Sequence, residues 1–185
     1  MNLRLATLGL CLSAWLLGTS GVAQELPKPT EAHKILATEE GTWDATVKAY
    51  VGGPNAEPSV SKGVETNEMM PGGMWLVSKF DGEFSGIKFQ GRGQFGFDPL
   101  KKKYVGTWVD SMSPTLSVLE GTYDAKTKTM TYVGDGVDVS TKAKYTQRMV
   151  TTTKDDGSRV FSLFMKYEGR GDEVKFMEIT YTKRK

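Results

Sequence analysis

Residues 41–51 read GTWDATVKAYV, and apolar and polar side chains alternate along them. Trp43 and Val47 fall on one face of an extended chain, while Asp44 and Thr46 fall on the other. Alternation with this period is typical of a β-strand that has one buried face. The stretch therefore predicts a strand, and most of the chain that follows it repeats the pattern.

Short turns rich in glycine, proline and aspartate divide the rest of the chain into further strands. The ten predicted strands span residues 41–51, 60–70, 74–81, 87–97, 104–112, 115–123, 129–133, 142–154, 159–168 and 173–183. No segment of helix length interrupts them, so we expect antiparallel pairing rather than parallel crossovers. Antiparallel strands in chain order favour an all-β fold, an up-and-down β-barrel of about ten strands, which leaves no exposed edges. A two-sheet sandwich is the alternative.

One short helix is predicted before the first strand. Thr30 is a suitable N-cap, and the apolar residues that follow it have helical spacing, which predicts a helix over residues 30–38. We therefore expect residues 24–40 to form a lead and a short N-terminal helix, and residues 41–185 to form the barrel domain.

Residues 1–23 have the three parts of a secretory signal peptide: Arg4 near the start, an apolar run over residues 5–18, and small residues before a cut at Gln24. The apolar run is shorter than the roughly 20 residues of a membrane-spanning helix, although an uncleaved anchor is the alternative. Cleavage would remove Cys11, the only cysteine, which suits an oxidising compartment. We expect a periplasmic or secreted protein with no integral membrane segment after cleavage.

Composition excludes several classes of function. The 24 basic and 22 acidic residues nearly balance, which argues against a nucleic-acid surface. One cysteine and one histidine, His33, exclude a cysteine-rich zinc site and a disulfide scaffold. The nucleophile-elbow, zinc-helix and phosphate-loop motifs are missing. We expect no cofactor, no metal and no catalytic residue, and a role other than that of an enzyme is favoured.

The segment from His33 to Trp43 resembles the start of lipocalin-type barrels, in which a short helix leads into a Gly-x-Trp strand. The resemblance implies that Trp43 closes one end of the barrel. It also implies that a basic residue of the last strand, Lys183 or Arg184, stacks on this tryptophan.

Four segments together resemble a mostly bacterial secreted family, domain of unknown function 1579. They are residues 33–43, residues 71–75 (PGGMW), residues 96–98 with the strand at 104–110, and residues 177–181 (MEITY). The resemblance covers essentially the whole chain after the signal segment. It implies a lipocalin-like, calycin-type barrel, and it implies no activity.

Two better-understood relatives of such barrels do not match in their binding residues. Nitrobindin-like barrels hold haem iron through a late histidine, and no histidine follows His33 in this sequence. Fatty-acid-binding barrels hold a carboxylate with an Arg-x-Tyr arrangement on the last strand, which here reads Tyr181-Thr182-Lys183.

Aromatic residues on the strands, together with two charged residues as polar anchors, are the candidates for ligand contact. These residues are Trp75, Lys79, Phe95, Trp108, Asp110 and Tyr132. Asp110 shares a strand face with Trp108, and if that face points inward, desolvation raises the pKa of the carboxyl and Lys79 would face it. The alternative, favoured by the position of Asp110 near a strand end, is that it lies at the solvated rim.

The best interpretation is a secreted or periplasmic lipocalin-like barrel that binds a small apolar or amphipathic ligand. One alternative is an envelope interaction or structural protein. Residues 160–165 are apolar on both strand faces, so the outer face would be covered by the opening helix or by a second copy in a homodimer. The other alternative is a barrel enzyme of the isomerase or cyclase type.

Overall fold

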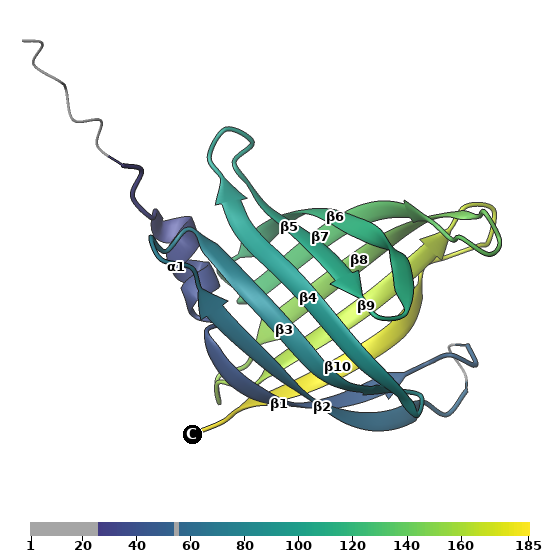
Figure 1. Ribbon diagram of the computed structural model, residues 1–185. Coiled ribbons are helices and arrows are strands. Elements are labelled where there is room, and N and C mark those ends of the chain that lie inside the picture. The colour runs from purple at the N-terminus through teal and green to yellow at the C-terminus, as the bar shows by residue number, and fades with distance from the viewer. Residues whose placement is uncertain (1–25, 54–55) are drawn as a thin grey trace, which may run out of the picture.

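The computed structural model describes residues 26–53 and 56–185, so the predicted signal peptide at 1–23 lies outside the described residues. Its ten strands close into one barrel, with a short helix at one end (Figure 1). The predicted all-β up-and-down barrel of ten antiparallel strands is confirmed, and the sandwich alternative is wrong.

Each strand pairs with its neighbours in chain order, and the last pairs with the first. The strands are β1 (Gly41–Ala49), β2 (Ser59–Met69), β3 (Trp75–Phe84), β4 (Ile87–Asp98), β5 (Lys103–Asp110), β6 (Ser113–Asp124), β7 (Thr129–Val137), β8 (Lys144–Thr153), β9 (Arg159–Tyr167) and β10 (Val174–Lys183). The β1–β10 seam runs in register from Trp43 opposite Lys183 to Ala49 opposite Met177. The seam leaves no strand of the sheet with an open edge.

The alternation along β1 has the expected physical origin. Trp43, Ala45 and Val47 are buried inside the barrel, whereas Asp44 and Lys48 are exposed outside. Successive side chains of a strand point to opposite sides of the sheet, so apolar residues at alternate positions fill the interior.

Helix α1 (Glu31–Ala37) packs mainly on β3 and β4 at the end of the barrel where β1 begins. The Thr30 amide donates to His33 Nδ1 at 2.9 Å, which caps the helix N-terminus. His33 is buried and lies edge-on to Phe97, and Leu36 joins the apolar core. The only histidine therefore serves helix capping and packing.

From the sequence, the opening helix is one possible cover for the outer side of β9. In the structure the helix packs on β3 and β4 instead. The Arg148 guanidinium lies 4.2 Å from the centre of the outward Phe164 ring, and Lys175 lies on the same ring. The aliphatic stems of such side chains cover apolar surface while their charged ends stay in water.

Candidate ligand-binding cavity

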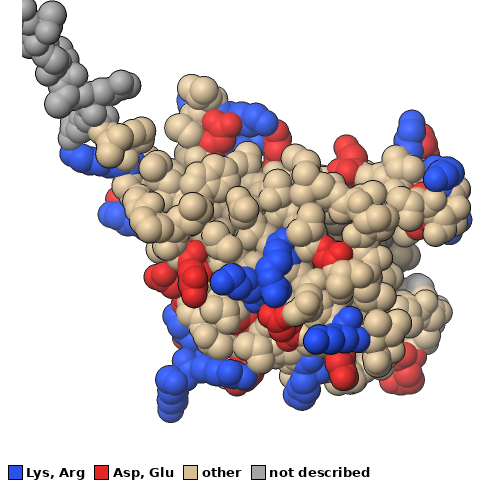
Figure 2. All heavy atoms as spheres, viewed as in Figure 1, with Lys and Arg blue, Asp and Glu red and all other residues tan. Residues whose placement is uncertain are grey.

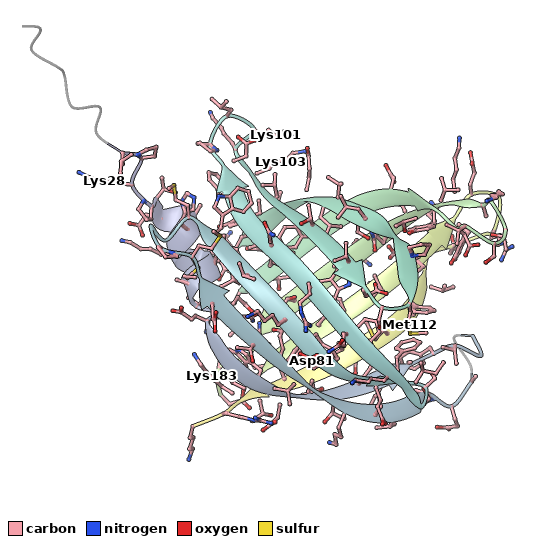
Figure 3. All side chains as sticks on the ribbon, in the orientation of Figure 1. Lys28, Asp81, Lys101, Lys103, Met112 and Lys183 are labelled. Carbon is pink, nitrogen blue, oxygen red and sulfur yellow. The ribbon has the colours of Figure 1, made fainter. Side chains whose placement is uncertain are left out.

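The barrel encloses a cavity of about 390 Å³, to which all ten strands contribute. The inward residues of β9, Phe161, Leu163 and Met165, line it and are nevertheless only half-buried. Met112, in the β5–β6 turn, lines the cavity and is 47% exposed. In Figure 3 it lies toward the end opposite α1. The cavity therefore opens at this end, which we call the mouth.

Glycines on neighbouring strands provide room for the large inward rings. The Trp108 ring lies against Gly91 and Gly93 of β4, where an added Cβ would overlap it. Phe95 lies against Gly106 and Tyr132 lies against Gly121 in the same way. Because the glycines have no side chain, each ring lies back along the barrel wall instead of projecting across the interior. The pattern keeps the centre of the barrel open.

Trp43 lies at the closed end, opposite the mouth, which we call the floor. Its indole N–H donates to the Glu39 carbonyl at 2.9 Å, and the side chain is buried. The Arg159 guanidinium stacks on the ring at 3.8 Å from its centre. Lys183 lies farther away, at 5.2 Å, and Arg184 pairs with Asp44 instead. The resemblance to lipocalin-type barrels implies that the cation stacked on this tryptophan comes from the last strand. Here Arg159 of β9 makes the closer contact.

Arg159 also forms the ion pairs of the floor. One end of its guanidinium contacts the Glu65 carboxylate at 2.8 Å, and the other end contacts Glu39. Burial lowers the pKa of Arg159 to about 10 and raises the pKa of Glu65, while hydrogen bonds from Asn67 and Tyr181 oppose the rise at Glu65. Two buried, oppositely charged groups are tolerated here because each compensates the other.

The profile of DUF1579, a protein family of unknown function, matches residues 28–183. The chain belongs to this family. The predicted membership of DUF1579 is confirmed. No curated protein matches the sequence.

A solved structure similar to this DUF1579 chain is the S-type phycobiliprotein lyase CPES from Guillardia theta. The alignment covers 82% of this chain and 92% of that chain, with a TM-score of 0.51 and 10% sequence identity. At this identity the likeness shows a shared lipocalin-like barrel fold alone.

Four of the six candidate ligand residues line the cavity of the DUF1579 barrel. Phe95, Trp108 and Tyr132 lie on its wall, and Phe95 and Tyr132 are in contact at 5.3 Å between ring centres. Asp110 lies near the mouth, where its carboxylate accepts from the Met112 and Ser113 amides at 2.9 Å each. These bonds hold the β5–β6 turn, so Asp110 lies at the rim, as its position near the strand end favoured.

Trp75 and Lys79 do not line the cavity, and their predicted inward orientation is wrong. Both lie on the outer face of β3, where Trp75 is 42% exposed and covers Gly96. The inward residues of this strand are Leu76, Ser78 and Phe80. Lys79 consequently cannot face Asp110 across the interior.

Sequence reasoning missed the polar groups of the interior. Buried polar residues that line the cavity are Glu65, Asn67, Ser78, Gln147 and Arg159. Gln147 donates to Ser117 at 2.9 Å, and Asn67 donates to Glu65 at 2.8 Å. Polar residues at alternate strand positions are typical of a solvated face, and only their pairing across the barrel identifies them as internal.

The described residues include no group of three or more histidine, cysteine, aspartate or glutamate side chains that could hold a metal ion. A second hollow, of about 760 Å³, lies at the mouth ends of β7, β8 and β9 and shares Tyr145 with the interior cavity. Its lining includes the exposed side chains of Lys144, Lys166 and Arg170. It is wide and open to water, so the interior cavity is the better candidate site for an apolar molecule.

Proposed function

We propose that the barrel binds one small apolar or amphipathic molecule inside its cavity. The observation that carries the proposal is the enclosed, mainly apolar space of about 390 Å³ with one open end. Pockets that hold small ligands are typically concave, largely apolar and roughly 300–1,000 Å³ in volume, with a few placed polar groups. The polar floor and the apolar wall together suit an amphipathic ligand.

We also propose that the chain acts after export, in a periplasm or outside the cell. Residues 1–23 have the pattern of a cleavable signal, and Cys11 is the only cysteine in the sequence. None of the helices in the described part of the chain has the length and apolar character needed to cross a membrane.

Filling the cavity should weaken ligand binding. Leu163→Trp adds bulk to an inward, half-buried position on β9, and we expect it to weaken binding of the neutral dye Nile red by about tenfold or more. Fluorescence titration of the purified protein measures the dissociation constant.

The matched control is Ser162→Trp, which places the same side chain on the outer face of the same strand. Ser162 pairs with Val150 and Glu178 and does not line the cavity. We expect its dye affinity to equal that of the unmodified chain. Equal affinity in both variants would place the dye outside the barrel, and failure of the unmodified chain to bind would contradict the proposed function.

A second candidate function, association with another copy of the chain, is favoured by one observation. Val109, Leu116, Val118 and Val133 are exposed on the outer faces of three neighbouring strands, β5 to β7. Figure 2 shows few charged side chains over this upper part of the barrel. The neighbour of Val133 on β6 is Glu120, so the apolar residues border a charged group, and exposed apolar surface with a polar rim is typical of interaction sites. We expect sedimentation equilibrium to detect a dimer that Val118→Lys removes, and a monomer at every concentration would eliminate this candidate.

A further inference from the structure

Three buried polar atoms among the described residues have no hydrogen-bond partner: Asn67 Oδ1, Tyr132 Oη and Arg159 Nε. Their side chains line the cavity, and the residues are only 3%, 8% and 4% exposed. Buried polar atoms are nearly always satisfied in folded proteins, and an unsatisfied one costs about 1–3 kcal/mol. An unpaired atom beside a cavity therefore points to a group that enters the cavity.

The orientation of the Asn67 amide follows from its two neighbours. Its Nδ2 donates to the Glu65 carboxylate at 2.8 Å and to the Glu39 carbonyl at 3.1 Å. Both neighbours are acceptors, so the amide nitrogen must face them and the amide oxygen must face elsewhere. Asn67 Oδ1 is consequently an acceptor that needs a donor, and none of the described side chains supplies one.

The charges around this acceptor disfavour an anionic ligand. Arg159 is the only basic residue among the described residues that line the cavity, and both ends of its guanidinium contact the carboxylates of Glu39 and Glu65. The other charged lining residues, Glu83 and Asp110, are acidic. Although the Nε–H of Arg159 has no partner, this one cation already faces two carboxylates, so a further carboxylate brought to the floor would lose its hydration and meet an excess of negative charge.

We propose that the polar end of the ligand is an uncharged hydrogen-bond donor of the alcohol type, and that it donates to Asn67 Oδ1 at the floor while its apolar part lies along the wall. The inference rests on the proposed function, and it adds the chemical class of the ligand. A hydroxyl supplies the missing donor, carries no charge into the interior, and leaves the Arg159 ion pairs intact.

Displacement of Nile red by three ligands built on a ten-carbon chain tests the head group. They are 1-decanol, decyl methyl ether, which keeps the oxygen but lacks its proton, and decanoate. We expect 1-decanol to compete about tenfold more strongly than the ether, the effect of one hydrogen bond to a buried acceptor. We expect decanoate to compete more weakly than decanol as well.

The variant Asn67→Leu removes the acceptor. We expect it to bring decanol and the ether to equal affinity while the affinity for the ether itself is retained. If this variant does not fold, the three-ligand series on the unmodified chain still decides the question. A variant that folds and keeps the preference for decanol would overturn the role of Asn67.

The outcomes separate the two proposals. Absence of Nile red binding contradicts the proposed function itself. Binding of Nile red with equal displacement by all three ligands leaves the proposed function in place and overturns the alcohol assignment, because a buried water would then satisfy Asn67. Strongest displacement by decanoate would overturn it too, since it requires a free cation at the floor.

Discussion

Replacing Arg159 with methionine is expected to destabilise the barrel by about 3–5 kcal/mol. The substitution leaves Glu65 buried without its partner, because the ion pair between them, at 2.8 Å, is lost. It also removes the guanidinium that lies 3.8 Å from the Trp43 ring and 4.8 Å from the Tyr181 ring. Urea unfolding followed by tryptophan fluorescence measures the loss.

Two variants serve as controls for this prediction. Arg184→Met breaks a solvent-exposed ion pair with Asp44 on the outside of the barrel, near the same floor, and should leave the unfolding midpoint unchanged within error. The double variant Arg159→Met with Glu65→Leu removes both buried charges and should recover part of the lost stability. Normal stability of Arg159→Met alone would show that the floor does not depend on this cation.

Substituting Gly91 with alanine is expected to close part of the cavity. The new Cβ would overlap the Trp108 ring, which must then move away from the wall and into the interior. Overpacking of this kind costs roughly 1–3 kcal/mol, and the displaced ring occupies space that a ligand needs. We expect Nile red affinity to fall and the emission of Trp108 to shift, both measured by fluorescence.

Gly96→Ala is the matched control on the same strand. A Cβ at Gly96 would lie 2.7 Å from the ring of Trp75, which is on the outer face of the barrel. The variant should be destabilised by overpacking as Gly91→Ala is, yet it should bind the dye normally. An equal loss of binding in both variants would show that stability, and not cavity volume, controls the dye.

Much of the fold could be predicted because its strands have the period of two and end at clear turns. The structure moves the predicted strand ends by a few residues; for example, β7 extends to Val137 and β8 begins at Lys144. The face of β3 that points into the barrel could not be predicted, because Trp75 and Val77 on one face are as apolar as Leu76 and Phe80 on the other. The structure distinguishes the two faces: Leu76 and Phe80 are buried inside the barrel, and Trp75 packs on Gly96 outside it.

The floor was harder to predict than the wall. Glu65 and Asn67 read as solvated positions of β2, because a strand-by-strand pattern contains no information about partners across the barrel. The resemblance to lipocalin-type barrels places the closing cation on the last strand, whereas Arg159 begins β9 and pairs with Tyr181 of β10. Placing it required the barrel register, which depends on how every preceding pair of strands is aligned.

The seam between β1 and β10 governs the order in which the chain can fold. Strand β1 meets β2 early, but its other edge pairs only with residues 177–183, which are made after all the other strands. The barrel therefore closes through contacts between distant parts of the sequence, which is a slow step. Until then both β1 and β9 present unpaired edges on which other chains can assemble. A chain that stops before β10 would keep both edges unpaired and aggregate. A chaperone that holds the chain extended would prevent this aggregation until the barrel closes.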